Sequence, residues 1–415
     1  MLLSYLKIAW KVLQRRKFFT FISLFGISFT LMILLVVYAL YDHTIGPHTP
    51  EKRIDRLLFI NKMELWGPQS QAVSNPSYSF LNRYARTLRT PEKVSIATAG
   101  GSAVAYVGNQ KLKLDLRATD GEFWQVLDFD FVAGRPYTVR EVNEAAHVAV
   151  INESTSRRYF GTTQGVLGRT LEADAEHYRV VGIVRDVPAT RQNTFADLWI
   201  PITVSTVNLR YPDYMGTCEA ILLARTAADA PAIQAEFARA VRQAPVQDPK
   251  SFTEVRVYAE SLLGATLRDI ADQSGPDPGI SRFVILVAGL SLLFMLLPAL
   301  NLVNLNVSRM LERSSEIGVR KAFGATNGAL IKQFLVENVF LTLLGGVVGL
   351  GLAAGALHLL NSSSLIGYAH FALNGRVFTV ALGIALFFGM LSGVYPAYKM
   401  SKLQAIEGLK GGTTK

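Results

Sequence analysis

The chain has 415 residues, of which 42 are Lys or Arg, 32 are Asp or Glu, half are hydrophobic and one is Cys. The apolar fraction excludes intrinsic disorder, and a single cysteine, Cys218, excludes an intramolecular disulfide framework or a multi-cysteine metal site. Charged residues make up 18% of the chain, fewer than the roughly 25% of soluble domains, so the placement of the apolar residues decides the class of protein.

Four long stretches of the sequence carry no charged residue. A membrane-spanning helix needs about 20 mostly apolar residues. We therefore predict four transmembrane helices, at 18–41, 283–307, 337–359 and 377–398, with an outer loop at 360–376. A signal peptide is the alternative for the first of them. Its 24 uncharged residues exceed the usual apolar region of such peptides, and Ala39-Leu40-Tyr41 is a poor cleavage site, which favours a retained anchor.

The basic residues predict the orientation of these helices. They gather in 1–17, in 308–336 and in the tail 399–415, which the positive-inside rule places in the cytoplasm, so that 42–282 lies outside. Residues 43–282 contain 27 basic and 27 acidic side chains. The net charge of +10 therefore belongs to the membrane-flanking segments, where it indicates topology and lipid-headgroup contacts rather than nucleic-acid binding.

The outer segment, 42–282, alternates in hydrophobicity and breaks at turns, which predicts a soluble mixed domain. Predicted strands are 57–64, 93–99, 111–117, 147–151, 177–184, 198–202, 219–224 and 253–258. Predicted helices are 78–88, 153–160, 230–243 and 260–273. Gly108-Asn109 is typical of a hairpin turn. The order of elements predicts an α+β fold made of two subdomains, one inserted in the other.

Candidates for catalysis in this segment are weak, because none has a suitable partner at a catalytic spacing. They are His147, His177, Asp128, Asp130, Ser154 and Ser156. The two aspartates resemble a paired carboxylate on one strand face, and the serines lack a Gly-x-Ser-x-Gly context. Three tryptophans are assigned to the core or an interface, namely Trp66, Trp124 and Trp199. We predict no active site and no bound cofactor or metal in this chain.

The cytoplasmic segment 308–336 is the part most suited to hold a partner protein. A helix over 309–323 places Glu312 and Glu316 on one face and puts Glu316 four residues before Arg320. Gly324 is placed to end this helix, and Thr326 to cap the next. A solvated charged loop is the alternative, but the segment is too apolar for one. No phosphate-binding Gly-x-x-x-x-Gly-Lys-Ser/Thr motif occurs, so we expect ATP hydrolysis on another chain.

Small and polar residues in the predicted spans indicate helix packing. The pairs Gly345/Gly349 and Gly351/Gly355 allow close helix approach, although glycine is also simply common in spans. Asn301 and Asn304 are placed either to hydrogen-bond across helices or to lie at the headgroups. No charged residue lies deep in any predicted span, which argues against a proton-coupled carrier.

Several motifs together resemble a known family. EIGVRKAFGA at 316–325, QFLVEN at 333–338 and SGVYPAYKMSKLQAIEGLK at 392–410, which includes Pro396, resemble the FtsX-like permease domain. The stretch 121–161 and VVGIVRDVP at 180–188 resemble the MacB-type periplasmic core domain. YLKIAWKVLQRRK, at the end of 1–17, is similar to the amphipathic entry helix of this family.

The resemblance implies a permease subunit of a MacB-type ABC transporter in the bacterial inner membrane, multi-pass, with both termini cytoplasmic. The outer domain would comprise a Porter-like part, about 50–117 and 220–275, and a Sabre-like insert, about 118–219. The coupling helix would contact an ATPase. Its implied residues are Glu312, Glu316, Gly318, Arg320, Lys321, Phe323 and Gly324. The implied packing residues are Asn301, Asn304, Gly345, Gly349, Gly351, Gly355 and Pro396.

The implied partners are two copies of a separate cytoplasmic ATPase, which binds ATP and Mg²⁺, and a second permease subunit, identical or paralogous. A periplasmic adaptor or outer-membrane channel is a further candidate. ATP-driven closure inside would move the outer domains, a process called mechanotransmission, for export or extraction of a substrate. The alternatives are an FtsX-like protein that transmits ATPase motion to an extracytoplasmic hydrolase or sensor, and a membrane-anchored receptor without an ATPase.

Overall fold

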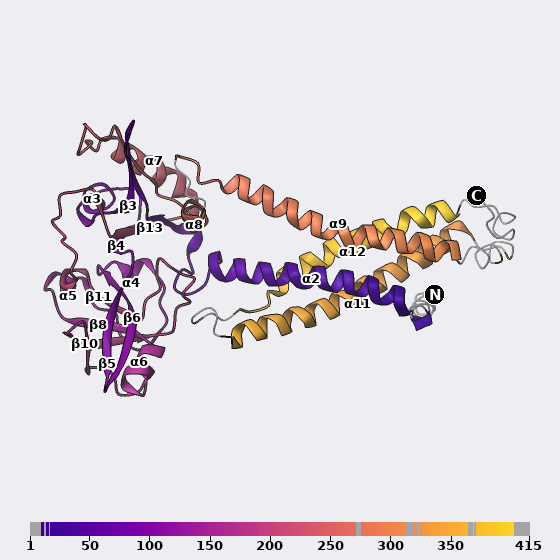
Figure 1. Ribbon diagram of the computed structural model, residues 1–415, viewed down its shortest axis with the longest axis horizontal. Coiled ribbons are helices and arrows are strands. Elements are labelled where there is room, and N and C mark those ends of the chain that lie inside the picture. The colour runs from indigo at the N-terminus through magenta and orange to yellow at the C-terminus, as the bar shows by residue number, and fades with distance from the viewer. Residues whose placement is uncertain are drawn as a thin grey trace. The chain divides into compact units, whose positions relative to one another are not determined.

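The computed structural model describes residues 10–11, 14–15, 17–270, 275–312, 319, 323, 326–363, 368 and 371–401 (Figure 1). The chain divides into two compact units. The first, here called the helical unit, comprises Met1–Tyr41, Phe283–Ser363 and Phe371–Lys415. The second, here called the α+β unit, comprises Asp42–Arg282 and Ser364–His370.

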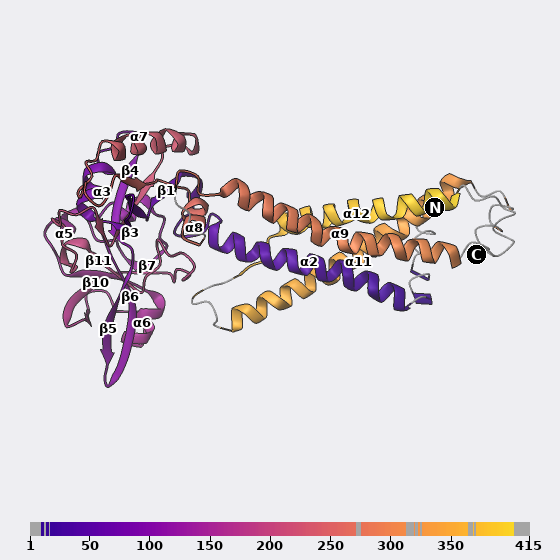
Figure 2. The ribbon, with the colours of Figure 1, turned by 45° about the horizontal axis from the view of Figure 1, so that its top comes forward.

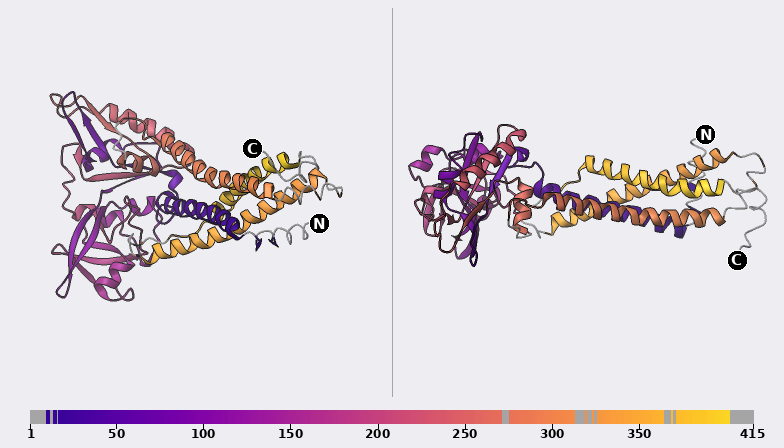
Figure 3. Two further views of the ribbon diagram at one scale, coloured as in Figure 1. Left: turned by 45° about the vertical axis from the view of Figure 1, so that its right-hand side comes forward. Right: turned by 90° about the horizontal axis from the view of Figure 1, so that it is seen from above.

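Four long helices contain the four predicted spans and extend beyond them at both ends. They are α2 (Lys17–Ile45), α9 (Ile280–Glu312), α11 (Asn327–Ser362) and α12 (Gly375–Ser401). Figure 3 shows these four long helices of the helical unit. Ile27 and Leu31 of α2 are buried with Leu341 of α11 and Ala381 of α12. Helix α11 begins ten residues before the predicted span 337–359, and no proline interrupts residues 327–336.

These helices expose large apolar side chains to an unusual degree. On α9, Val284, Ile285 and Leu286 are 53%, 72% and 60% exposed. Helices that are apolar all round occur inside large proteins or in bilayers. Among the described residues, Thr20–Ile45 and Ile331–Ser362 are long and apolar enough to cross a membrane, and Ile280–Leu296 and Gly375–Leu391 are shorter apolar stretches. A signal sequence near the N-terminus has the same character as the first, so four spans stay a prediction.

The α+β unit contains two sheets. The larger has the strand order β1-β13-β4-β6-β11-β8-β10-β7, with β5 beside β6 and β9 beside β10. These strands are β1 (Leu57–Ile60), β4 (Lys93–Thr98), β5 (Gly101–Val107), β6 (Gln110–Thr119), β7 (Phe131–Gly134), β8 (Val148–Asn152), β9 (Thr170–Ala173), β10 (Glu176–Val184), β11 (Leu198–Pro201) and β13 (Cys218–Leu223). The smaller sheet has the order β12-β3-β2-β14. Its strands are β2 (Met63–Trp66), β3 (Gln71–Pro76), β12 (Met215–Gly216) and β14 (Glu254–Val257).

Short helices accompany the sheets of this unit. They are α3 (Tyr78–Tyr84), α4 (Phe123–Val126), α5 (Val139–Asn143), α6 (Glu153–Phe160), α7 (Ala230–Arg242) and α8 (Leu262–Ile270), with 3₁₀ turns at Ile54–Arg56, Ile202–Val204 and Ala227–Asp229. Helix α6 has the predicted bounds because both of its ends are encoded locally. The Asn152 side chain accepts a hydrogen bond from the Thr155 N–H, and Gly161 ends the helix at φ +75°.

The larger sheet has a weak line between β4 and β6. These two strands share a single residue pair, Ala97 with Thr119, whereas β6 pairs along its length with β5 and β11. The expected boundary between the Porter-like and Sabre-like parts at 117/118 falls within β6, two residues before its end at Thr119. The division into these two parts stays a prediction.

Other elements also differ from the predicted ones. The strand expected over 57–64 is two strands, because 57–60 pairs with β13 in the larger sheet and 63–66 pairs with β3 and β14 in the smaller one. The hairpin turn at Gly108-Asn109 is confirmed, with Val107 opposite Gln110 and Gly108 at φ +59°. Figure 2 shows this β5–β6 hairpin. The core placement of Trp199, which is fully buried beside Trp124, is also confirmed.

Candidate functional site

The catalytic candidates in the α+β unit have structural partners instead of reactive neighbours. Asp128 and Asp130 lie in irregular chain, not on a strand face, and bind different cations. The Arg53 Nε donates to Asp128 at 2.9 Å, and the Lys52 Nζ donates to Asp130 at 2.9 Å. The hydrogen bond from Lys52 lowers the pKa of Asp130. A paired carboxylate, which needs two acids sharing one site, is therefore contradicted.

Three of the remaining catalytic candidates, Ser154, Ser156 and His147, also have structural partners. The Ser154 hydroxyl donates to Asp186 at 2.7 Å, and the His147 imidazole lies 3.5 Å from the Glu176 carboxylate and stacks on Tyr178. Within the described residues, no group of three or more His, Cys, Asp or Glu side chains is placed to hold a metal ion. The polar interior of this unit is instead organised by buried ion pairs.

A fully buried ion pair holds the chain just after α2. The Arg191 guanidinium donates to the Glu51 carboxylate at 2.5 Å and to the Gly46 carbonyl at 2.6 Å. Both side chains are 0% exposed, and the Thr194 hydroxyl adds a third hydrogen bond, to Glu51 at 3.0 Å. Burial raises the pKa of Glu51, while Arg191 acts in the opposite direction. A charge at this depth stays in place only with its partner.

Arg191 begins a short stretch that we call the anchoring segment, residues 191–197. Its Gln192 carbonyl accepts a hydrogen bond from Arg117, which in turn forms a buried ion pair with Glu219. The Asn193 amide oxygen accepts from Asn61 at 2.7 Å. One irregular segment therefore contacts the chain after α2, the middle of the larger sheet and the link between β1 and β2.

The other end of the anchoring segment holds Tyr368. This residue belongs to the 364–370 stretch of the α+β unit. Its hydroxyl donates to Asp197 at 3.1 Å and accepts from Arg158 at 3.0 Å, and its ring packs on Phe195. Tyr368 has a backbone φ of +59°, a conformation that residues other than glycine seldom adopt unless the surrounding structure holds them in it. These contacts supply that constraint.

A second buried ion pair holds the chain before α9. Glu260 and Arg268 bond through both carboxylate oxygens, with the Arg268 Nε 3.0 Å from Glu260. Arg268 also donates to the Gly275 carbonyl at 2.7 Å. Glu260 exchanges both backbone hydrogen bonds with Phe59, the third residue of β1. The segment that leads to α9 is thus joined to the first strand of the unit.

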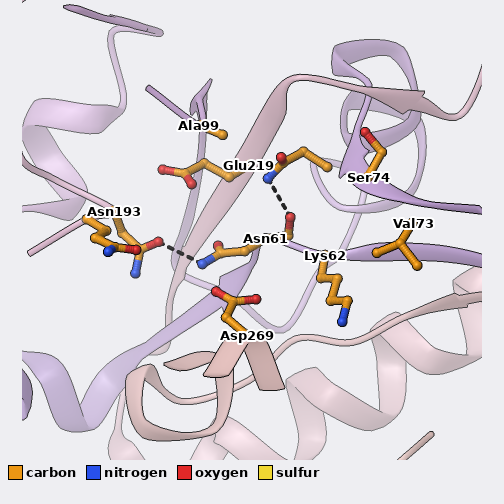
Figure 4. Close-up of a pocket in the computed structure, with 10 residues that line it drawn as sticks. Asn61, Lys62, Val73, Ser74, Ala99, Asn193, Glu219 and Asp269 are labelled. Carbon is orange, nitrogen blue, oxygen red and sulfur yellow. Dashed lines mark hydrogen bonds between the residues drawn. The ribbon is translucent and has the colours of Figure 1, made fainter. Parts of the chain in front are cut away.

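A polar cavity of about 390 Å³ adjoins the anchoring segment (Figure 4). Asn61, Asn193 and Asp269 lie around it, and Glu219 forms part of its wall. Burial raises the pKa of Glu219 to about 7, with Arg117 opposing the shift. The carboxyl group at the cavity wall is therefore harder to ionise than that of a solvent-exposed glutamate.

Substitution of Glu219 by Gln should change how stability depends on pH. The pKa of Glu219 is raised from 4.5 to about 7, so between these values the folded state holds a proton that the unfolded chain has lost. The free energy of unfolding should therefore fall as pH rises through this range and level off above it. Urea denaturation from pH 5 to pH 8 should show a shallower fall in Glu219→Gln. Equal slopes in both proteins would contradict the assignment.

The coupling residues predicted from the sequence are only partly described. Glu312 is the last residue of α9. Phe323 is 89% exposed, and its N–H donates to the Val319 carbonyl at 3.1 Å. The predicted cap is present, since the Thr326 side chain accepts a hydrogen bond from the Ala329 N–H. The other predicted coupling residues, Glu316, Gly318, Arg320, Lys321 and Gly324, lie outside the described residues.

The four glycines of α11 that the sequence predicted as packing residues fall into two pairs. A β-carbon on Gly345 would lie 2.7 Å from Ile27 of α2, and one on Gly349 would lie 2.9 Å from the Ser28 carbonyl oxygen. Gly351 and Gly355 have no described heavy atom within 4 Å of that position. The first pair thus lies against α2, and the second faces open space. For Asn301 and Asn304 in α9 and Pro396 in α12, the structure describes the helical backbone.

The sequence analysis missed the buried charges. Glu219 stands in the otherwise apolar strand β13, Arg117 lies near the buried end of β6, and Arg191 stands in a loop before the apolar β11. A single charge at an inward strand position is a usable indication of a buried pair, because an isolated charge would be too costly there. The partner of each charge and the contact of Tyr368 with Asp197 could not be predicted from the sequence. The residues of these pairs are separated by 102, 140 and 171 positions.

Comparison with known proteins gives two family matches. Residues 20–240 match the MacB-like periplasmic core domain, and residues 288–405 match the FtsX-like permease C-terminal domain. The chain is 26% identical over 345 residues to the ABC transporter permease YknZ of Bacillus subtilis, which covers 82% of this chain and 75% of YknZ.

Two export proteins are also similar. The pyoverdine export ATP-binding/permease protein PvdT of Pseudomonas aeruginosa is 24% identical over 98% of this chain and 58% of its own length. The macrolide export ATP-binding/permease protein MacB of Bdellovibrio bacteriovorus is 24% identical over 76% of this chain and 47% of its own length. This chain therefore spans only about half the length of these two relatives. The solved periplasmic region of MacB from Actinobacillus actinomycetemcomitans aligns with a TM-score of 0.36 and 16% identity, covering 53% of this chain and 94% of that one.

In the chain, the α+β unit lies between two long apolar helices, α2 and α9, and its residues fall largely within the first family match. The first family match alone covers more than half of the chain, and the second covers most of the remainder. The protein belongs to the family of ABC transporter permeases that combine a MacB-like periplasmic core domain with an FtsX-like permease domain.

Proposed function

We propose that this chain is the permease subunit of a MacB-type ABC transporter that turns ATP hydrolysis into motion of the α+β unit on the outer side of the bacterial inner membrane. All four long helices span the bilayer in this proposal, and both chain ends are cytoplasmic. ATP and Mg²⁺ are bound by an ATPase whose phosphate-binding motif this sequence does not contain. A second permease subunit completes the transporter.

The observation that carries the proposal is the pair of buried anchors on the chain segments next to α2 and α9. Glu51 and Glu260 each form a buried ion pair with an arginine, Arg191 and Arg268. Movement of a helix reaches the α+β unit only if the chain segment next to that helix is rigidly attached to the unit. Buried ion pairs with additional hydrogen bonds are stiff, since breaking either partner leaves a charge without compensation. This geometry supports mechanical transmission better than passage of a substrate through a catalytic site.

The relatives favour export as the outcome of this motion. PvdT and MacB are named for the export of pyoverdine and macrolides. We extend only the shared element to this chain, namely movement or release of a substrate on the outer side. The open face at Gly351 and Gly355 supports a second permease subunit, because small residues on a helix surface permit close approach of another helix.

The proposal is tested by purifying the full chain from its native membranes in mild detergent and measuring the ATPase activity that accompanies it. Phe323, on the predicted coupling segment, is the accessible residue to change. Phe323→Asp should reduce the bound ATPase activity by at least about tenfold, because a charge replaces an apolar contact at the centre of an interface. Tyr106→Asp, an equally drastic change at an exposed residue of the α+β unit, should leave it unchanged.

Three results would count against the proposal. Wild-type protein that carries no ATPase, under conditions in which a known ABC transporter permease keeps its own, would leave only the family relationship. Equal ATPase activity in Phe323→Asp and wild type would remove the coupling role of this segment. Capture of a cell-wall hydrolase by the α+β unit, with export unaffected by deletion of the chain, would replace transport by regulation.

A further inference from the structure

The cavity beside the anchoring segment lies between the two sheets of the α+β unit (Figure 4). Its walls come from β3 of the smaller sheet, from β13 and the chain after β1 and β4 of the larger one, and from α8. Its volume of about 390 Å³ is within the range of small-ligand sites, roughly 300–1,000 Å³. A cavity of this size at the meeting of two sheets is a candidate binding site.

The chemistry of the lining restricts the ligand. Its carboxamides are Asn61, Asn75, Gln192 and Asn193. Its charged groups are Lys62, whose ammonium group also lies 3.5 Å from Glu64, Glu219, which is paired with Arg117, and Asp269. None of the ten described lining residues is aromatic, so the flat face on which bases and sugar rings commonly stack is lacking. Carboxamides donate and accept hydrogen bonds at once, and the charges have both signs. This combination suits a ligand that has amide groups and carries both charges.

Two of these carboxamides are held in place before any ligand arrives. The Asn61 Nδ2 donates to the Asn193 Oδ1 at 2.7 Å, and the Asn75 Nδ2 donates to the Asn61 carbonyl at 2.6 Å. The Asn61 Oδ1 is buried and accepts no hydrogen bond from the described residues. A buried acceptor left in this way destabilises the folded state. An N–H donor that reaches it from the cavity would remove that cost.

Strand β3 adds an unpaired edge at the same place. It pairs with β2 over residues 71–74, but with β12 only at Asn75 and Pro76. No described strand therefore covers the β12 side of residues 71–74, and Val73 is 47% exposed there. An exposed strand edge binds extended peptides by adding them as a further strand.

We propose that this cavity binds a short extended peptide of about two or three residues. Its backbone pairs with the free edge of β3, its ammonium group faces Asp269, and its carboxylate faces Lys62. Gln192 and Asn193 belong to the anchoring segment, whose other residues contact Glu51 and Tyr368. A bound peptide would therefore act on the segment that holds both of these residues. The inference deepens the proposed function, on which this role of the bound peptide rests. The binding itself does not depend on an ATPase.

Triglycine is the probe, titrated by calorimetry into the full chain in lipid nanodiscs without ATPase. We expect saturable binding. N-acetyl-triglycine amide, which lacks both charges, should bind at least about tenfold more weakly. Asp269→Asn and Lys62→Met should each weaken triglycine binding to a similar degree. The control Glu144→Gln removes an exposed carboxylate just after α5 and should leave the affinity unchanged. Tryptophan fluorescence confirms that each variant is folded.

Absence of triglycine binding to folded wild type would overturn the inference, as would unchanged affinity in both variants. Binding of N-acetylglucosamine in place of triglycine would assign the cavity to sugars instead. The two proposals fail separately. Triglycine binding without ATPase association would contradict the transporter proposal alone, and ATPase association without triglycine binding would contradict the peptide site alone.

Discussion

Replacement of Arg191 by Met should lower the free energy of unfolding of the α+β unit by about 3–5 kcal/mol. The substitution leaves the Glu51 carboxylate fully buried without its cation, and it removes the hydrogen bond to the Gly46 carbonyl. Urea denaturation of the full chain, followed by tryptophan fluorescence, measures the loss, because Trp124 and Trp199 lie within the core of this unit.

A matched control and a double variant define this effect. Arg140→Met breaks an ion pair with Glu144 that is exposed on both sides and should cost less than about 1 kcal/mol. The double variant Arg191→Met with Glu51→Leu removes both buried charges and should regain most of the stability lost in the single variant. A loss below 1 kcal/mol in Arg191→Met would show that this pair does not anchor the chain after α2.

Gly349→Leu should separate α2 from α11, whereas Gly351→Leu should not. A β-carbon at Gly349 lies 2.9 Å from the Ser28 carbonyl oxygen and 3.1 Å from the Leu31 β-carbon, so a larger side chain forces the helices apart. Overpacking of this kind costs about 1–3 kcal/mol. The midpoint of thermal unfolding in detergent should therefore fall in Gly349→Leu and stay near the wild-type value in Gly351→Leu.

The same two variants report on the second subunit. Gly351 faces open space in the single chain, so an effect there must come from another molecule. Loss of the dimer in Gly351→Leu, at an unchanged unfolding midpoint, would place the subunit contact on this face of α11. Identical unfolding midpoints for the two variants would contradict the close packing at Gly349.

Elements whose bounds are set by a few adjacent residues were predictable from the sequence. Helix α6 follows from the Asn152 cap and Gly161, and the β5–β6 hairpin follows from Gly108-Asn109, because both depend on a few adjacent residues. The long apolar helices follow from uncharged stretches. Strand order did not follow, since the pairing of β6 with β11 depends on which strand offers a free edge after folding.

The candidate site shows the same division. The coupling segment and the glycine pairs could be proposed from the sequence because each is contiguous or spaced at a helical period. Arg191 and Glu51 are 140 positions apart, and Tyr368 reaches Asp197 across 171. Such contacts carry no mark in the neighbouring sequence. The free edge of β3 was equally hidden, because the residues of β3 lack the strict alternation of a half-buried strand.

Cys218 has a practical consequence for following the proposed motion. It is the sole cysteine of the sequence, it is fully buried in β13, and burial raises the pKa of its thiol to about 12. Thiol reagents attack the thiolate, so this position stays unlabelled in the folded protein. A cysteine introduced at the exposed Tyr106 would then be the single labelling site of each chain. Spin labels there would report the distance between two subunits with and without ATP, with no native residue to replace first.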